Sequence, residues 1–167
     1  MNNNKKRLAV AFTGPSNSGK TTLIIKVSNI LQDSGYKVAI VKHDPKDKAT
    51  FDKEGKDSFK FSQTGADVAV ISPNKTTIFK KQTSDIENLI DIFDNFDFLL
   101  VEGLKTLPLP RICVMRDKID ERYFEVSDSI ATDGSINKND FSNQMNILDL
   151  NNPEQIVQWI QENAKVV

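Results

Sequence analysis

Apolar residues along this chain occur either in short continuous runs or at the three- and four-residue spacing of an amphipathic helix. A continuous run is typical of a parallel strand that is covered on both faces, and the helical spacing predicts a helix with one buried face. Strands are predicted at residues 8–13, 38–41, 98–103 and 111–116, with weaker candidates at 129–133 and 146–148. Helices are predicted at residues 20–34 and 57–64, and from residues 84 and 153 onward.

Residue types that favour helix ends support two of these boundaries. Ser84 with Glu87 three residues later matches the capping box, in which each side chain bonds the other residue's backbone N–H. Asn152 followed by Pro153 is typical of an N-cap and a first helical position. We therefore expect helices to begin at both places.

The order of the elements indicates the fold class. Strand, helix and strand over residues 8–41 form a βαβ unit with a right-handed crossover. Two further strands at residues 67–72 and 76–80 are joined by so short a link that we expect an antiparallel hairpin. The sequence therefore predicts an α/β fold, a mostly parallel sheet flanked by helices with an inserted antiparallel β-hairpin.

Composition and charge limit the binding partners and the cellular location that we expect for this protein. A net charge of −1, with charged residues at 27 %, gives no field suited to nucleic acid or an acidic membrane. No apolar stretch approaches the roughly 18 residues of a membrane span, and no signal-peptide pattern is present, so we expect a cytoplasmic protein. The single cysteine, Cys113, excludes an internal disulfide, and its place in an apolar run predicts a buried thiol.

One segment carries a specific chemical signal. Between the strand at 8–13 and the helix at 20–34 lies the pattern Gly, four residues, Gly-Lys-Ser/Thr: Gly14-Pro15-Ser16-Asn17-Ser18-Gly19-Lys20-Thr21, followed by Thr22. Such a loop points its backbone N–H groups at phosphates, and the helix adds its positive end. Lys20 is expected to reach the β- and γ-phosphates, and the Thr21 hydroxyl to bind Mg²⁺. We therefore expect one P-loop nucleotide-binding domain over residues 1–167, in which the highly charged segment 45–57 is a mobile insertion.

Polar residues at strand ends extend this site. Ligands of open α/β sheets bind at the carboxyl ends of the strands, where Lys42, His43, Asp44, Glu102, Thr132 and Asp133 are predicted to lie. Asp97 begins its strand and is expected at the opposite edge. We expect Glu102 to hold Mg²⁺ through a water molecule, with Asp44 as a second candidate for the outer shell of the metal.

Two segments are candidates for recognising the base. Residues 137–140, Asn-Lys-Asn-Asp, match the guanine-reading pattern of many GTPases, but they follow no buried strand and we interpret the match as chance. Asp133 has a better position, and its carboxylate can accept from guanine N1–H and N2–H₂. His43, the only histidine, is either a surface or packed residue or a contact to phosphate or substrate.

The phosphate loop is accompanied by further motifs between residues 8 and 133. These are Lys42-His43, Asp52-x-x-Gly55-Lys56-Asp57-Ser58, Gly65-Ala66, Val101-Glu102-Gly103-Leu104-Lys105 and residues 111–116. Together they resemble the MobB family, the GTP-binding adaptors of molybdopterin guanine dinucleotide biosynthesis. The resemblance implies a cytoplasmic homodimer that binds GTP with Mg²⁺ and hydrolyses GTP slowly. It also implies molybdopterin as a bound substrate, and as partner a MobA-type guanylyltransferase that attaches GMP to the molybdenum cofactor.

The segment Gly55-Lys56-Asp57-Ser58 permits two interpretations. It predicts a flexible loop that enters a helix, with Asp57 or Ser58 as the N-cap. Alternatively, Lys56 and the first N–H groups of that helix bind a second anion, such as the phosphate of molybdopterin.

Two other functions use the same fold. A small-molecule kinase needs lid arginines that neutralise the transferring phosphoryl group, and no arginine-rich lid follows the third strand. A GTPase that delivers a soft metal needs His/Cys clusters, and this chain has one residue of each type. We expect at most a slow GTPase, with Lys20 and Glu102 as candidate catalytic residues, because no water-orienting glutamine or arginine finger is evident.

Overall fold

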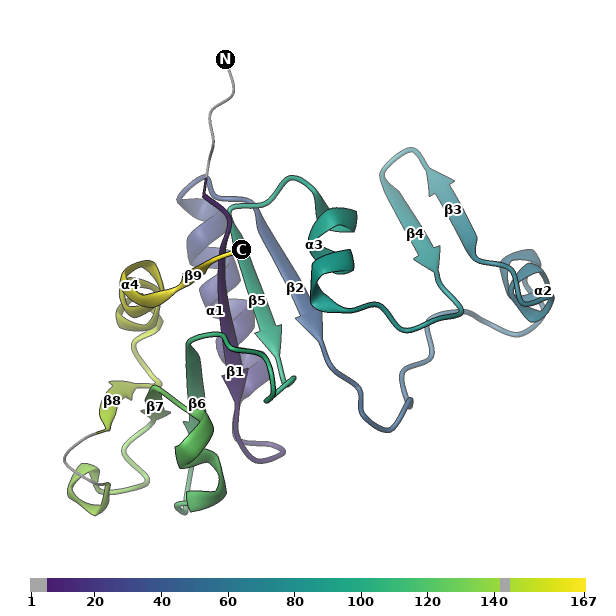
Figure 1. Ribbon diagram of the computed structural model, residues 1–167. Helices are drawn as coiled ribbons and strands as arrows, with labels where there is room; N and C mark the ends of the chain where they lie inside the picture. Colours follow the sequence, from purple (N-terminus) through teal and green to yellow (C-terminus); the bar gives the residue numbers. More distant parts are fainter. Residues whose placement is uncertain (1–5, 142–144) are drawn as a thin grey trace. The chain divides into compact units, whose positions relative to one another are not determined.

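The computed structural model describes residues 6–141 and 145–167, which form two compact units (Figure 1). The larger unit comprises Met1–His43 and Phe93–Val167, and the smaller unit comprises Asp44–Ile92. The parallel sheet belongs to the larger unit and the hairpin to the smaller one. No helix in the described ranges is both long enough and apolar enough to cross a membrane.

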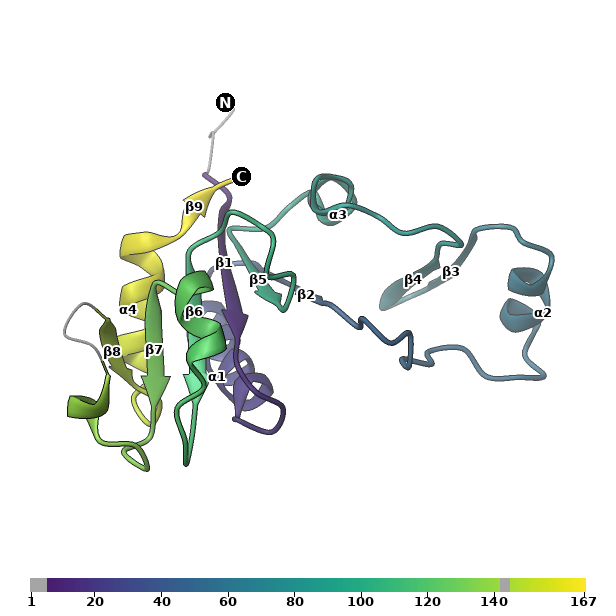
Figure 2. The ribbon, with the colours of Figure 1, turned by 60° about the horizontal axis from the view of Figure 1, so that its bottom comes forward.

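The larger unit is built on a sheet whose strands lie in the order β2, β5, β1, β6, β7, β8 (Figure 2). Each neighbouring pair in this order is parallel. The predicted parallel sheet is confirmed, and the predicted strand ends agree with the structure to within one residue. The strands are β1 (Leu8–Thr13), β2 (Val38–Lys42), β5 (Phe98–Glu102), β6 (Arg111–Met115), β7 (Ser129–Thr132) and β8 (Asn146–Asp149).

The register of the sheet brings the carboxyl ends of the strands to one edge. Phe12 of β1 and Lys42 of β2 both lie beside Glu102 of β5. On the other side of β1, Met115 of β6 lies beside Thr132 of β7. The loops that leave these strands therefore converge, as ligand-binding loops do in open α/β sheets.

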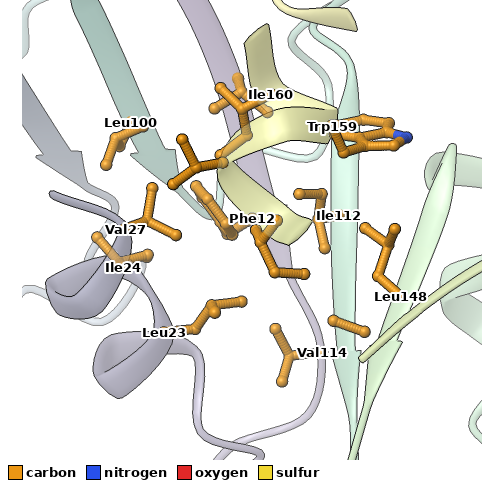
Figure 3. Close-up of a cluster of buried hydrophobic side chains, with 14 of the residues drawn as sticks. Phe12, Leu23, Ile24, Val27, Leu100, Ile112, Val114, Leu148, Trp159 and Ile160 are labelled. Carbon is orange, nitrogen blue, oxygen red and sulfur yellow. The ribbon is translucent and has the colours of Figure 1, made fainter. Parts of the chain in front are cut away.

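Helices α1 (Lys20–Asp33) and α4 (Pro153–Asn163) pack on one face of the sheet (Figure 3). As predicted, Asn152 caps α4 by accepting a hydrogen bond from the Gln155 N–H at 3.0 Å. Burying each large apolar side chain contributes about 1.5–3 kcal/mol, so this cluster is the main stabilising element of the unit. The side chains labelled in Figure 3 are Phe12, Leu23, Ile24, Val27, Leu100, Ile112, Val114, Leu148, Trp159 and Ile160.

One strand of the sheet was not predicted. β9 (Lys165–Val166) pairs antiparallel with β1 at Leu8 and Ala9. Because β6 pairs with β1 only from Ala11 onward, the start of β1 has an edge that β9 can fill. Two residues are too few to show a periodic pattern, so no sequence signal marks this strand.

A second cluster covers the opposite face of the sheet over β6 and β7. Cys113, Met115 and Ile130 pack there against Ile136 and Phe141. The covering segments include two 3₁₀ helices, η1 (Glu121–Val126) and η2 (Lys138–Asp140). The predicted buried thiol of Cys113 is confirmed.

The smaller unit contains a hairpin and short helices. The hairpin strands β3 (Val68–Ser72) and β4 (Lys75–Phe79) are antiparallel, as predicted, and are linked by Pro73-Asn74. Helix α2 (Asp57–Gln63) precedes the hairpin, and α3 (Ile86–Phe93) follows it. Residues 44–56 form neither helix nor strand, in agreement with the predicted loop.

The predicted capping box of α3 is wrong by one residue. The helix begins at Ile86, and Asp85 rather than Ser84 provides the cap. The Asp85 carboxylate accepts a hydrogen bond from the Asn88 N–H at 2.8 Å. Aspartate is as good an N-cap as serine, so two adjacent candidates compete and the sequence alone does not separate them.

The environment of Cys113 leads to a test of the core. Burial raises the pKa of the Cys113 thiol to about 12, so the thiol is protonated and inaccessible at pH 8. Because the thiolate is the reactive form, we expect DTNB to label the native protein at least ~100-fold more slowly than the unfolded protein. The control in guanidinium should show reaction of the single cysteine. Rapid labelling of the folded protein would contradict this packing.

Candidate functional site

The loop between β1 and α1 has the backbone conformation of a phosphate loop. Gly14 and Gly19 have φ angles of +132° and +100°, which side-chain-bearing residues rarely adopt, and Asn17 has a φ of +63°. Gly19 occupies the N-cap position of α1 and provides no side-chain cap. The first N–H groups of α1 are therefore left for a ligand, and an anion is favoured at this end of the helix.

Gly14 is required by a close approach between two backbone segments. A Cβ atom at this position would lie 2.3 Å from the carbonyl oxygen of Val114 on β6. It would also lie 3.2 Å from Ser18 Oγ, which is buried without a hydrogen-bond partner. The loop thus fits against the sheet only when residue 14 has no side chain.

Lys20 folds back over the loop. Its Nζ donates hydrogen bonds to the carbonyl oxygens of Gly14, at 3.0 Å, and Pro15, at 2.6 Å. Burial lowers the pKa of Lys20, and the nearby Glu102 carboxylate acts in the opposite direction. The ammonium group therefore lies where a phosphate in the loop can compete for it.

A cavity of about 510 Å³ opens beside this loop. Its lining includes loop residues between Ser16 and Thr22, with both Thr21 and Thr22 among them. Charged side chains from outside the loop complete it, from Lys42, Glu102 and Arg116. The phosphate-loop residues, Lys42 and Glu102 are therefore brought together, and Arg116, which was not predicted as a site residue, joins them.

Lys42 and Glu102 form an ion pair across neighbouring strand ends. Lys42 Nζ lies 3.4 Å from Glu102 Oε2, and the Glu102 side chain is 15 % exposed whereas that of Lys42 is 64 % exposed. An exposed pair of this kind contributes at most about 1 kcal/mol. Within the site, the pair holds the Glu102 carboxylate at the edge of the cavity.

Arg116, the first residue after β6, extends into the same cavity. Its guanidinium Cζ lies 3.5 Å from the position that a Cβ on Gly19 would occupy. Arg116 Nε lies 2.9 Å from Asp133 Oδ2, and Asp133 Oδ1 accepts from the Ser135 N–H at 3.2 Å. Hydrogen bonds from Ser135 and the charge of Arg116 lower the pKa of Asp133.

The rule that placed Lys42 and Glu102 at this edge could also have found Arg116. All three residues stand at carboxyl ends of parallel strands, where ligands bind. Acids at these ends were given roles as candidate metal ligands or as the base reader. Basic residues at the same ends carry the same positional signal.

His43 lies beside the site without lining the cavity. Its backbone N–H donates to the carbonyl oxygen of Glu102 at 3.0 Å. A Cβ atom on Gly103 would lie 3.0 Å from His43 Cβ, so the histidine packs against that glycine. His43 is itself exposed, and its contact to phosphate or substrate stays a prediction.

Asp44 and Lys56 belong to the smaller unit. The Asp44 carboxylate accepts hydrogen bonds from backbone N–H groups of its own loop, those of Lys48 at 2.6 Å and Ala49 at 2.7 Å. Lys56 is the N-cap residue of α2 and makes no side-chain cap. The roles of Asp44 in metal binding and of Lys56 in anion binding stay predictions.

Neither expected cap of α2 is present. Asp57 is the first helical residue rather than the N-cap, and the Ser58 hydroxyl donates to Asp52 Oδ1 at 3.0 Å instead. The segment 137–140 lies around the short helix η2, where Asn137 caps by accepting from the Asn139 N–H at 3.0 Å. The Asn137 side chain is therefore used as a local helix cap, which agrees with the interpretation of this segment as a chance match to the guanine-reading pattern.

Arg111 fixes the loop that follows Glu102. Its side chain is fully buried, and Nη1 donates to the carbonyl oxygen of Gly103 at 2.8 Å. Nη2 donates to the carbonyl oxygens of Leu104 and Leu107, both at 3.0 Å. Burial lowers the pKa of Arg111, and the three carbonyl groups compensate for the lost hydration of its charge.

A parallel sheet with a phosphate loop after its first strand, and a cationic cavity at the carboxyl edge, defines a P-loop nucleotide-binding protein. The family model for molybdopterin guanine dinucleotide synthesis protein B, MobB, matches residues 9–132. The chain therefore belongs to the MobB family.

Individual relatives agree with this assignment. The chain is 36 % identical over 115 residues to a Methanocaldococcus jannaschii protein named as an adapter of molybdopterin-guanine dinucleotide biosynthesis, and the match covers 65 % of this chain and 47 % of that protein. It is 30 % identical over 169 residues to the corresponding adapter protein of Escherichia coli K12, covering 92 % and 93 %. The chain thus spans about half of the first relative and most of the second.

A solved structure shares the fold. Bacillus subtilis MobB superposes with a TM-score of 0.74 at 22 % identity, covering 95 % of this chain and 98 % of that chain. At this identity the similarity shows the fold alone.

The backbone contact of Gly14 leads to a stability test. We expect Gly14→Ala to lower the free energy of unfolding by ~2 kcal/mol or more, because its Cβ meets a strand carbonyl. Gly35→Ala is the matched control, since Gly35 also has a positive φ but a Cβ there meets nothing within 4 Å; it should cost about 1 kcal/mol. Equal losses in urea unfolding would show that the contact with β6 is unimportant.

Proposed function

We propose that this protein binds GTP with Mg²⁺ and acts as an adaptor in the conversion of molybdopterin to molybdopterin guanine dinucleotide. The observation that carries the proposal is the phosphate loop of Gly14 to Thr22, with the Lys20 ammonium held over it. Membership of the MobB family supports the pathway. The nucleotide is presented to a MobA-type guanylyltransferase, the proposed partner, in the cytoplasm.

The charge of the cavity suits a triphosphate. Lys20, Lys42 and Arg116 carry positive charge there, and Glu102 is the carboxylate found in the described lining. Cations near a phosphate site raise the affinity for phosphate most where they are partly desolvated, as Lys20 is. The excess of positive charge would compensate for the negative charge of the phosphates of a bound nucleotide.

The residues present also fit Mg²⁺. Thr21 lines the cavity and its hydroxyl is the proposed direct ligand, and Glu102 is the proposed acid that acts through water. No group of three or more His, Cys, Asp or Glu side chains in the described part of the chain is arranged to hold a metal ion, so binding would depend on the oxygens of the nucleotide. Bound Mg²⁺ would neutralise phosphate charge and orient the phosphates.

GTP hydrolysis is proposed to be slow. The described lining of the cavity contains neither histidine nor glutamine, the side chains that most often activate or orient an attacking water. Catalysis would then come from positioning and electrostatics, with Lys20 and Glu102 as the candidate residues. A protein of this kind acts mainly by holding GTP.

Asp133 is the proposed guanine reader, and Lys56 the proposed contact to molybdopterin. Both carboxylate oxygens of Asp133 already accept one hydrogen bond, from Arg116 and Ser135, and each has a second lone pair for guanine. Lys56 is exposed on its loop, where an ammonium group can meet the phosphate of molybdopterin. Molybdopterin affinity unchanged by Lys56→Ala would remove that part of the proposal.

A homodimer is proposed through the smaller unit. β3 and β4 form a separate two-stranded sheet, and such a sheet is marginal in water by itself. Apolar side chains of the unit are exposed, among them Phe51 at 85 %, Phe61 at 59 % and Ile71 at 81 %. A second copy of the chain would cover this surface.

Titration with Mg·GTP and Mg·ATP tests nucleotide binding. Lys20→Ala should weaken both nucleotides by about 10- to 100-fold, because a charge-assisted hydrogen bond contributes about 1.5–3 kcal/mol. Lys26→Ala, an exposed lysine of the same helix, is the control and should leave both affinities unchanged. Unaltered binding by the Lys20 variant would refute a phosphate loop.

The same titration tests guanine recognition. Asp133→Ala should weaken Mg·GTP at least ~10-fold more than Mg·ATP, because guanine offers two donors to the carboxylate and adenine offers it no equivalent pair. The ratio of the two losses is the measurement. Equal losses would show that Asp133 does not read the base.

Sedimentation equilibrium tests the dimer. Ile71→Lys should convert a dimer into a monomer at micromolar concentration, because it places a charge in the proposed apolar interface. Ile25→Lys is the matched control, since Ile25 is a half-exposed isoleucine of α1 in the other unit. A monomeric wild-type protein, or a dimer that survives Ile71→Lys, would contradict this interface.

A further inference from the structure

Arg116 stands out among the cavity residues because the proposed function gives it no specific task. Its guanidinium lies against the backbone of Gly19, with Cζ, Nε and Nη2 between 3.5 and 3.7 Å from the position of a Cβ there. Gly19 precedes Lys20, the residue that reaches the phosphates in a loop of this type. The guanidinium therefore lies on the phosphate side of the cavity.

The ion pair with Asp133 leaves most of the guanidinium unused. Asp133 Oδ2 contacts Nε at 2.9 Å, and the structure shows no hydrogen bond from Nη1 or Nη2 to another described residue. Arginine has five N–H donors in a rigid plane. Fixing Nε orients the remaining donors, and two of them can bind phosphate oxygens side by side.

Stability does not explain this pair. The side chains of Arg116 and Asp133 are 42 % and 21 % exposed, and ion pairs with such exposure contribute little to folding. The Asp133 carboxylate is itself held by the Ser135 N–H. Because the Asp133 carboxylate is itself held, it can fix the direction in which the Arg116 guanidinium points beside the phosphate loop.

We propose that Arg116 is a ligand of the nucleotide phosphates and that Asp133 is the positioning residue that directs its guanidinium into the cavity. This inference rests on the proposed nucleotide binding and names a phosphate contact supplied from outside the phosphate loop. Lysine at position 116 would keep the charge but lose both the planar fork and the anchored Nε.

Calorimetric titration with inorganic triphosphate and with GTP, both with Mg²⁺, tests the inference. Arg116→Gln should weaken both ligands by about tenfold or more, because both carry the phosphates that Arg116 binds. Arg116→Lys should show a smaller loss. Asp133→Asn should also weaken inorganic triphosphate, although less than Arg116→Gln, because Nε loses its charged anchor.

Arg122→Gln is the matched control. Arg122 Nη2 lies 2.6 Å from Asp120 Oδ2, and the Arg122 side chain is 85 % exposed and does not line the cavity. Its loss should therefore change neither the affinity for GTP nor that for inorganic triphosphate. Thermal unfolding of each variant confirms that it is folded. Arg116→Lys serves as the second variant if Arg116→Gln does not fold.

The possible results separate this inference from the proposed function. If the wild-type protein binds neither ligand, the proposed function fails and this inference fails with it. If the wild-type protein binds both and Arg116→Gln binds them equally well, the inference alone is overturned. If Arg116→Gln weakens GTP but not inorganic triphosphate, Arg116 contacts the nucleoside, and its role as a phosphate ligand is likewise rejected.

Discussion

The candidate site depends on one close approach between backbone segments, that of Gly14 to the carbonyl group of Val114 on β6. β1 and β6 remain paired up to Thr13 and Cys113, so the loop leaves β1 directly against its neighbour. Within the described loop, the backbone hydrogen bond from the Ser18 N–H to Pro15 is long, at 3.4 Å. The contact with β6 and the hydrogen bonds from Lys20 Nζ to Gly14 and Pro15 therefore act together on the loop conformation, and the core that holds the sheet also holds the start of the loop in place.

The charges of the cavity follow from the same register. Lys42 and Glu102 meet because β2 and β5 end side by side, and Arg116 and Asp133 meet because β6 and β7 do. Each outer cation thus has a carboxylate on the neighbouring strand end, while Lys20 bonds to loop carbonyls. Such partly exposed pairs add little stability, so their main effect is to orient cations around the loop.

Sequence patterns predicted the elements that are defined by long apolar runs or by a motif with its own chemistry. β5 and β6 are buried on both faces, and so their residues form continuous apolar runs from Phe98 to Val101 and from Ile112 to Met115. The features that were missed have no such pattern: β9 pairs through two residues, and η1 and η2 are short 3₁₀ turns. The cap of α3 was misplaced because Ser84 and Asp85 have similar capping strength. Arg116 was overlooked although it follows a strand end as Asp133 does, and its pairing with Asp133 could not be predicted because it depends on β6 and β7 being neighbours.

The two units differ in what stabilises them. β2 and β5 are adjacent parallel strands, so Asp44–Ile92 lies within a single crossover, far longer than the dozen or so residues that such a connection needs. The larger unit has clusters of buried side chains on both faces of its sheet. The smaller unit has short helices and a two-stranded sheet with exposed apolar side chains, which are marginal without further contacts. The described residues that line the cavity all belong to the larger unit, whereas the exposed Phe51, Phe61 and Ile71 belong to the smaller one.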